Sequence, residues 1–346
     1  DKAACNKTYA KWGGFLKDMD CFDPLFFHIS PLEAESMDPQ ERLFLQCVYH
    51  AIQDAGYTAD NLTQREYFGV KNNVGVYVGV MYEEYQMYGA QSQEKGHIYS
   101  LNGSEASIAN RVSYTFSFHG PSMSVDTMCS SSLTALYLAC KSIIYHECEV
   151  AIAGGVNLSL HPNKFIMLGQ SRFAAEDGRC RTFGENGSGY VPGEGVGVVI
   201  LKPLKDAIED GDHIYGIIKG AALNHGGKSG GYTVPNPAAQ TSVILNAWEQ
   251  AKIDPKTISY IEAHGTGTSL GDPIEIAALN HAFEGKVDCK QFCNIGSIKS
   301  NIGHCESAAG IAGLTKILLQ MKYGYIVPSL HSQILNEKID FANSPF

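Results

Sequence analysis

Residues 125–135 read VDTMCSSSLTA, and this stretch decides the fold assignment. An apolar, strand-like lead-in ends near Asp126, and a serine-rich stretch then passes into an apolar helical pattern that runs to Tyr145. Cys129 lies at the switch. A thiol at a helix N-terminus meets unpaired backbone N–H groups and the positive end of the helix dipole, which favour the thiolate. We therefore expect Cys129 to be a nucleophile with a lowered pKa, although a small buried thiol is the alternative.

Strand and helix patterns alternate on both sides of this stretch. In the first half, Val-rich and apolar runs predict strands over 72–82, 121–127, 149–157, 195–204 and 213–224, with helices over 104–116 and 130–145. In the second half, the patterns predict a strand over 257–265, a strand followed by a loop over 292–304, and helices over 235–253, 272–283 and 307–324. Such alternation predicts a mixed α/β fold whose buried sheets are covered by helices. We place the boundary between an N-terminal half (1–210) and a C-terminal half (211–346) in a surface turn.

Composition excludes several classes of protein. The 346 residues carry a formal net charge of −10, which argues against nucleic acid as a partner because phosphate binding needs a basic face. No apolar run is long enough to span a bilayer, so we expect no membrane insertion. The ten cysteines are scattered rather than arranged as a disulfide framework, which predicts free thiols in the cytoplasm. Cys289, Cys293, His304 and Cys305 match a zinc site poorly, so we expect no metal.

A second candidate segment, EAHGTGTSLGDP at 262–273, follows a predicted strand. His264 ends that strand, and the glycines beside Thr266 let the backbone approach a ligand closely. Thr266 and Thr268 add hydroxyl groups. The glycine spacing departs from the dinucleotide fingerprint by one residue, which leaves nucleotide binding as a weaker alternative and a turn histidine as the simplest one.

A third segment, SIKSNIGHCESAAG at 297–310, places Lys299 and His304 in a loop and Glu306 at the start of the next helix. These groups can hydrogen-bond one another and tune a site, whereas a solvated loop with a helix-capping Glu306 is the alternative. One cysteine and two histidines, each at a strand end or in a loop, form a constellation for acyl transfer. A serine hydrolase lacks support because the chain has no G-x-S-x-G elbow, and the signature of a papain-like protease is absent as well.

With these motifs the sequence resembles a β-ketoacyl synthase, the ketosynthase domain of a bacterial modular type I polyketide synthase. DTMCSSSL (126–133) resembles the nucleophile motif of that family, EAHGTGTSLGDPIE (262–275) its first histidine motif, and KSNIGHCESAAG (299–310) its lysine and second histidine motif. The stretches MYEEYQMYGAQ (81–91) and HGGKSGGYTVPNP (225–237) are similar to synthases whose acyltransferase is a separate protein.

The resemblance implies a thiolase-like fold, with two similar halves stacked in five α-β-α-β-α layers, and a homodimer. It implies that Cys129 takes an acyl chain from an acyl carrier protein and that a malonyl-type extender then loses carbon dioxide. His264 and His304 would stabilise the enolate, Lys299 would hold His304 through Glu306, and Thr266 and Thr268 would bind the pantetheine arm. No cofactor is bound directly on this interpretation, because the phosphopantetheine arrives on the carrier. Neighbouring domains of a megasynthase are the remaining expected partners.

The resemblance also predicts that this chain is a fragment. Family members begin with a further strand and end with a glycine-rich motif, and neither pattern is found in these residues. Three alternatives to an elongating ketosynthase stay open: a domain that only passes acyl chains on, a carrier-docking module without catalysis, and a thiolase or stand-alone fatty-acid synthase. An unreactive Cys129 would favour the docking module.

Overall fold

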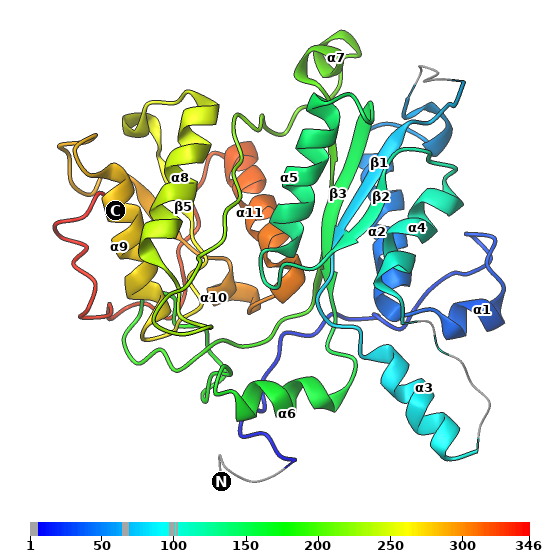
Figure 1. The fold of residues 1–346 in the computed structure, drawn as a ribbon, viewed down its shortest axis with the longest axis horizontal. Coiled ribbons are helices and arrows are strands. Elements are labelled where there is room, and N and C mark those ends of the chain that lie inside the picture. The colour runs from blue at the N-terminus through cyan, green and yellow to red at the C-terminus, as the bar shows by residue number, and fades with distance from the viewer. Residues whose placement is uncertain (1–5, 64–68, 97–100, 102) are drawn as a thin grey trace.

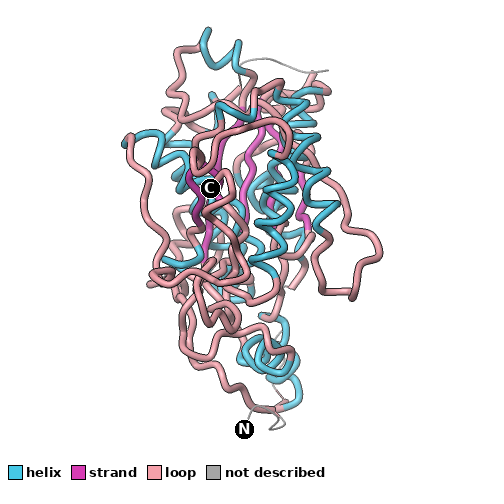
Figure 2. The backbone as a smooth tube through the Cα atoms, turned by 90° about the vertical axis from the view of Figure 1, so that its left-hand side faces the viewer, coloured by secondary structure: helices cyan, strands magenta, loops and turns pink. Residues whose placement is uncertain are grey.

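The computed structural model describes residues 6–63, 69–96, 101 and 103–346, and its elements stack in five layers (Figure 1). Helices α2 (Pro39–Asp54) and α4 (Glu105–Thr115) form the first layer, and a four-stranded sheet forms the second. Helices α5 (Ser131–Ile144) and α11 (Ala309–Tyr323) lie in the middle. A two-stranded sheet and the pair α8 (Pro237–Ala251) and α9 (Gly271–Phe283) complete the order. The side view in Figure 2 shows the strands enclosed between helices.

The larger sheet has the order β2-β1-β3-β4, formed by β1 (Val74–Gly79), β2 (Ser122–Val125), β3 (Val150–Asn157) and β4 (Gly195–Leu201). The first three strands are parallel, and β4 runs antiparallel to β3. Every residue of β1 and β3 is buried, as expected for strands covered on both faces. Because β1 and β2 are parallel, their C-terminal ends lie on the same side of the sheet. From that side the chain passes from β2 to Cys129 and α5.

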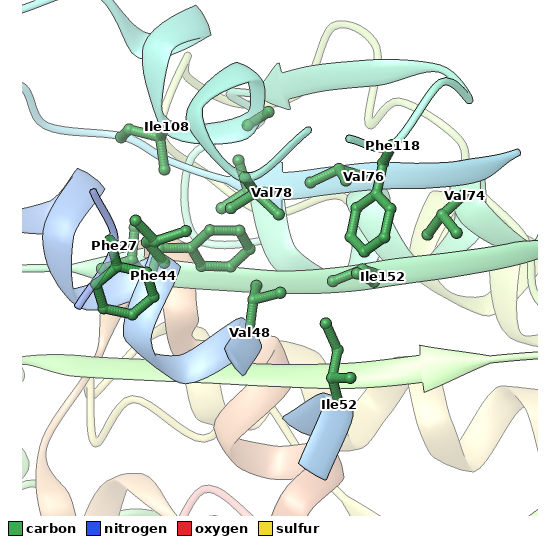
Figure 3. Packing of buried hydrophobic residues seen from close by; sticks show 14 of the residues in the cluster. Phe27, Phe44, Val48, Ile52, Val74, Val76, Val78, Ile108, Phe118 and Ile152 are labelled. Carbon is green, nitrogen blue, oxygen red and sulfur yellow. The ribbon is translucent and has the colours of Figure 1, made fainter. Parts of the chain in front are cut away.

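The main hydrophobic core lies between this sheet and α2 and α4 (Figure 3). Phe44, Val48 and Ile52 share one face of α2 and pack toward Val78 and Ile152 of the sheet. Their i, i+4, i+8 spacing is the stripe that a helix presents to a core. The opposite face of the sheet packs on α5, where the small side chains of Ala135 and Ala139 are fully buried. Small residues on both sides bring α5 close to the strands.

Two glycines set the height of α5 above the sheet. A Cβ atom added to Gly79 of β1 would lie 2.4 Å from the backbone nitrogen of Ser132. A Cβ atom on Gly155 of β3 would lie 2.7 Å from the Cβ atom of Ser132. Side chains at either position would lift the first turn of α5 away from the strands. These two glycines therefore determine the position of the first turn of α5, and with it the position of Cys129, three residues before Ser132.

The second sheet pairs β5 (Tyr260–Glu262) with β6 (Asn294–Gly296) in parallel. Its core is formed with α8 and α9, where Trp248 packs edge-to-face on Phe283. The remaining elements are α1 (Pro31–Ser36), α3 (Tyr85–Glu94), α6 (Pro162–Gln170), α7 (Leu204–Glu209), α10 (Lys299–Ile302), and the 3₁₀ turns η1 (Ala59–Asn61), η2 (Pro255–Thr257) and η3 (Glu306–Ala308). None of the described helices has both the length and the apolar character that a bilayer crossing requires.

The predicted elements are confirmed with two exceptions. The expected loop within 292–304 contains the short helix α10. Residues 213–224 were expected to form a strand, but the structure describes them as irregular backbone. Their apolar composition resembles a strand, yet none of the described strands pairs with this segment, so it has no ladder of hydrogen bonds. Ile217 and Leu223 remain exposed on it. Apolar composition alone therefore did not decide its structure.

Candidate active site

Cys129 occupies the turn between β2 and α5, directly before the N-cap residue Ser130. Met128 adopts a left-handed backbone conformation with φ +57°, which costs a non-glycine residue about 1–3 kcal/mol. Hydrogen bonds hold this turn: Ser131 Oγ donates to the Met128 carbonyl at 2.5 Å, and the Thr127 N–H donates to Ser131 Oγ at 2.9 Å. The turn therefore fixes Cys129 at the start of α5, as the sequence predicted.

The pKa of Cys129 differs from our expectation. We expected the helix N-terminus to lower it, but burial, and after it the nearby Glu306 carboxylate, raise it to about 11. The ammonium groups of Lys299 and Lys164 act in the opposite direction. Loss of water around the thiol outweighs the helix end because the thiolate is the form that burial disfavours. The free thiol is therefore protonated at neutral pH in this geometry.

His264 follows β5, and its backbone is held by α9. The carboxylate of Glu275 accepts hydrogen bonds from the His264 N–H at 2.6 Å and from the Gly265 N–H at 2.8 Å. Thr182 Oγ1 donates to the Gly265 carbonyl at 2.6 Å. Sequence reasoning missed the role of Glu275, because as the fifth residue of α9 it lies beyond the first turn and no capping pattern marked it.

Thr266 and Thr268 lie in the same loop, with their hydroxyl oxygens 3.4 Å apart. Asp272, buried at the start of α9, accepts hydrogen bonds from the Gly267 N–H at 3.2 Å and the Thr268 N–H at 3.3 Å. Burial raises the pKa of Asp272 to about 6, and these N–H donors oppose the rise. The loop after β5 is thus shaped by carboxylates that α9 supplies.

His304 is fully buried between α10 and η3, and its hydrogen bonding defines its tautomer. The backbone N–H of Glu306 donates to His304 Nδ1 at 3.0 Å. Because Nδ1 accepts, the proton of a neutral ring must lie on Nε2. The rings of His264 and His304 are 5.4 Å apart at an interplanar angle of 84°, and Tyr190 packs on the other side of His304 at 4.8 Å. The structure therefore brings both predicted histidines together.

Both imidazoles are neutral at pH 7. Burial lowers the pKa of His304 well below its ordinary range, and the charges of Lys299 and Lys164 lower it as well. Part of the His264 side chain faces solvent, but desolvation of its protein-facing side and the Lys299 ammonium group lower its pKa too. A neutral ring with a defined N–H is a hydrogen-bond donor that adds no full charge to the pocket.

The sequence had suggested that Glu306 connects Lys299 to His304, but the structure gives the Glu306 side chain other partners. Its buried carboxylate instead forms an ion pair of 2.5 Å with Nζ of Lys164 on α6, and it accepts a 3.3 Å hydrogen bond from the Tyr190 hydroxyl. Sequence reasoning missed Lys164, which lies 142 positions away and is fully buried. A lysine in an otherwise apolar helical stretch was the available signal, because lysines are almost never fully buried unless they are paired.

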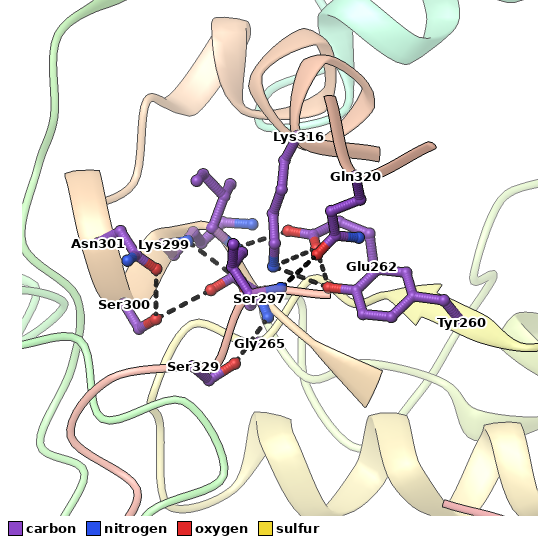
Figure 4. Close-up of polar contacts among 12 residues, drawn as sticks. Tyr260, Glu262, Gly265, Ser297, Lys299, Ser300, Asn301, Lys316, Gln320 and Ser329 are labelled. Atoms are coloured by element: carbon purple, nitrogen blue, oxygen red, sulfur yellow. Dashed lines mark hydrogen bonds and ion pairs between the residues drawn. The ribbon is translucent and has the colours of Figure 1, made fainter. Parts of the chain in front are cut away.

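Lys299 is nearly buried at the start of α10, and burial lowers its pKa while the carboxylates of Glu275 and Glu262 oppose that change. Beside it lies a second buried ion pair, in which Lys316 of α11 meets Glu262 of β5 at 2.8 Å (Figure 4). Glu262 also accepts the Ile298 N–H at 2.5 Å and thereby fixes the backbone before Lys299. In the described part of the chain, no three His, Cys, Asp or Glu side chains are placed to hold a metal ion.

The second half of the site meets the first through α5. Ser132 Oγ, in the first turn of α5, accepts a hydrogen bond of 3.1 Å from the Ile311 N–H of α11. A Cβ atom added to Gly310 would lie 2.4 Å from the Leu133 side chain. The helix that begins after Cys129 and the helix that begins after His304 therefore touch at their first turns. The structure thus joins the segment that carries Cys129 to the segment that carries His304, whose ring lies 5.4 Å from that of His264.

Comparison with known proteins gives a consistent result. The family model described as "Beta-ketoacyl synthase, N-terminal domain" matches residues 1–207, and "Beta-ketoacyl synthase, C-terminal domain" matches 215–333. All 346 residues align with the polyketide synthase PksL of Bacillus subtilis at 67% identity, and the whole chain aligns with ThaG of Burkholderia thailandensis at 59%. The chain spans only 8% and 6% of the lengths of these two proteins.

Solved structures give the same family and the fold. The oxazolomycin ketosynthase domain from Streptomyces albus JA3453 superimposes with a TM-score of 0.96 at 52% identity, covering 100% of this chain and 58% of that one. The ketosynthase from module 6 of the bacillaene synthase of Bacillus subtilis 168 superimposes with a TM-score of 0.88 at 44% identity, covering 96% and 56%. The expected thiolase-like fold is confirmed by these neighbours.

Proposed function

The chain belongs to the β-ketoacyl synthase family as a ketosynthase of the polyketide-synthase type, and from this premise we propose that its own residues carry out decarboxylative Claisen condensation. Cys129 is the nucleophile, and His264 and His304 are the donors to the enolate. The observation that carries this proposal is the hydrogen bond from the Glu306 N–H to His304 Nδ1, because it leaves Nε2–H free to donate. The proposed substrates are acyl and malonyl-type thioesters on acyl carrier proteins.

In the first proposed step, Cys129 Sγ attacks the acyl thioester on the pantetheine arm. The new bond joins Sγ to the acyl carbon, the bond from that carbon to the pantetheine sulfur breaks, and the thiol proton of Cys129 passes to the departing thiolate. Backbone N–H groups at the start of α5 stabilise the oxyanion of this step. A thiol whose pKa is raised by burial loses its proton as the new bond forms rather than beforehand.

In the second proposed step, the malonyl group loses carbon dioxide, and the electron pair of the broken bond forms the enolate. The negative charge develops on the thioester oxygen, where the N–H groups of His264 and His304 donate hydrogen bonds. A single preorganised donor of this kind contributes about 10²–10³ in rate. The enolate carbon then attacks the Cys129 thioester, and the Cys129 sulfur leaves and regains a proton. The product is a carrier-bound β-ketoacyl chain.

Other residues take supporting roles in this proposal. Lys299 holds the pKa values of both histidines down, which keeps them neutral donors. Thr266 and Thr268 hydrogen-bond the pantetheine arm. That arm arrives on the acyl carrier protein, so the chain itself binds no cofactor directly. The curated relatives are long polyketide synthases of which this chain matches a small part, which supports neighbouring domains as partners. We further propose a cytoplasmic location, a homodimer, and an acyltransferase supplied as a separate protein. The unpaired edge of β2 in the described sheet offers one surface for such a dimer.

Intact-mass analysis tests the proposal with the full chain, an acyl thioester and a malonyl carrier. We expect acyl mass on the enzyme only when Cys129 is present, followed by a carrier-bound chain two carbons longer. Cys129→Ala should abolish both steps, and His304→Ala should remove the extension. Acylation without extension in the parent protein would indicate a domain that only transfers acyl chains. No acylation of a folded protein would indicate a docking module.

A further inference from the structure

Lys164 is a buried cation that the proposed chemistry does not use directly. Its side chain is fully buried on α6, and Nζ donates to Asn157 Oδ1 at 3.1 Å and to the Leu158 carbonyl at 3.3 Å. Its third partner is Glu306 Oε2 at 2.5 Å, and the Tyr82 ring centroid lies 4.6 Å away. Two of these contacts are hydrogen bonds and the third is an ion pair, and the helix that carries Lys164 is remote in sequence from η3. A charge buried this deeply is costly to place, which indicates a specific role.

Glu306 is the residue through which Lys164 reaches the catalytic centre. Its backbone has φ +46°, a conformation that a non-glycine residue holds only when its surroundings impose it. The carboxylate is tied at both oxygens, to Lys164 and to Tyr190, while the backbone N–H of the same residue donates to His304 Nδ1. Holding the side chain therefore holds the N–H that selects the tautomer of His304. A shift of about 1 Å in a positioning group can lower a rate by about 10²-fold.

We propose that Lys164 is a positioning residue whose ammonium group anchors and neutralises the Glu306 carboxylate, so that the Glu306 N–H keeps His304 as the Nε2–H donor. This inference rests on the proposed function of His304 and extends it to a residue outside the three catalytic motifs. Neutralisation matters because the reaction creates an enolate. An uncompensated carboxylate two residues from His304 would repel that negative charge and favour the imidazolium over the neutral ring.

The surrounding charges agree with this role. Lys164 lowers the pKa values of both His304 and Cys129, whereas Glu306 raises that of Cys129 and those of Tyr82 and Tyr190. At the Cys129 thiol the two members of the pair act on the pKa with opposite signs. The titratable groups that the charges of the pair reach are Tyr82, Glu84, Cys129, Tyr190, His304 and Cys305.

The test compares single and double variants in the full chain. Lys164→Met removes the ammonium group at similar size, and Lys164→Met with Glu306→Gln removes both charges at once. We expect the single variant to lose condensation by about 100-fold and the double variant to recover to within about tenfold of the parent. Lys164→Arg, which keeps the charge, should retain more activity than Lys164→Met. Lys205→Met, in an exposed ion pair with Glu209, is the control for the substitution itself.

Two readouts separate positioning from a merely structural role. In Lys164→Met the acid limb of the condensation pH profile should move to higher pH, because the unpaired carboxylate raises the pKa of His304, and the double variant should restore it. A structural role would lower the rate equally at every pH. Ring-nitrogen NMR of His304 should show Nε2–H in the parent and lose that pattern in Lys164→Met.

The outcomes also separate this inference from the function on which it rests. If the parent protein does not condense its substrates, the proposed function fails, and the NMR comparison still decides the role of Lys164. If Lys164→Met leaves the tautomer and the pH profile unchanged, or if the double variant is as impaired as the single one while both melt at the parent temperature, the inference is wrong. If Lys164→Met does not fold, the Arg and double variants decide by the same two readouts.

Discussion

The imidazole ring of His304 is nearly perpendicular to that of His264, with an angle of 84° and 5.4 Å between the ring centroids. Two charged rings at this distance would repel each other, and the lowered pKa values of both show that the pocket keeps them neutral. A neutral imidazole ring can donate a hydrogen bond through its N–H group, and it carries no full positive charge. The pair is therefore set up for hydrogen bonding rather than for ion pairing.

This arrangement predicts the pH dependence of condensation. The ordinary pKa of histidine is 6.5, and both rings titrate below it, so acidification from pH 8 to pH 6.5 should not remove the neutral donors. We expect single-turnover condensation, measured from pre-acylated Cys129, to stay level across that interval and to decline only at lower pH. A decline centred at or above pH 6.5 would contradict the neutral-donor assignment.

The raised pKa of Cys129 predicts slow alkylation at neutral pH. Since the thiolate fraction grows tenfold per pH unit below a pKa of about 11, the iodoacetamide rate at Cys129 should rise about tenfold per unit through pH 9. Peptide mass spectrometry can follow Cys129 and the exposed Cys289 in one sample, and Cys289 should be labelled first at pH 7.5. A rate at Cys129 that levels off below pH 8 would show that the helix N-terminus outweighs burial after all.

Glu275 is expected to control activity without touching the reacting atoms. Glu275→Gln replaces one of the two acceptor oxygens that hold the His264 and Gly265 N–H groups with an NH₂ donor. The loop should shift, and condensation should fall by about 10–100-fold, because small misplacements at a reacting centre are costly. The matched control is Glu284→Gln at the exposed C-terminal end of the same helix. Equal activity of both variants in a coupled carrier assay would remove Glu275 from the positioning network.

Gly79→Ala tests how the sheet places the nucleophile. The added Cβ atom would lie 2.4 Å from the Ser132 nitrogen, so the first turn of α5 must move. We expect a loss of about 1–3 kcal/mol in the free energy of unfolding, as for other overpacked sites, and slower acylation of Cys129. Gly230→Ala, where the structure places nothing within 4 Å, is the control. Urea unfolding and intact-mass acylation measure the two effects, and an unchanged acylation rate would show that the turn adjusts independently of the sheet.

The sequence predicted the elements that local pattern determines. Alternation, Val-rich runs and helix starts located β1, β3, β4, α5 and α11. The motifs placed Cys129 and His264 after strands and His304 in a loop, as the structure has them. The apolar pattern wrongly predicted a strand over 213–224. A strand also needs a neighbouring strand to pair with, and pairing is not a local property of the sequence.

The sequence did not predict which charged residues pair, or the pKa of Cys129, for a similar reason. Lys164 and Glu306 are distant in the chain, and nothing in the periodicity of α6 indicates which partner its lysine meets. The pKa of Cys129 was misjudged because the helix end is readable from sequence, whereas the depth of burial that opposes it is a property of the packed structure.

The Lys164–Glu306 pair has a consequence for protein engineering. Lys164 belongs to the half of the chain before the turn near residue 210, and Glu306 belongs to the half after it. A hybrid enzyme assembled by joining the two halves of different parents at that turn would inherit one charge from each. Parents that both carry the pair can be recombined there, but a parent that lacks one member leaves a lone ion in the interior of the chimera. Compatibility across the junction is therefore a question of matched charge as well as of matched shape.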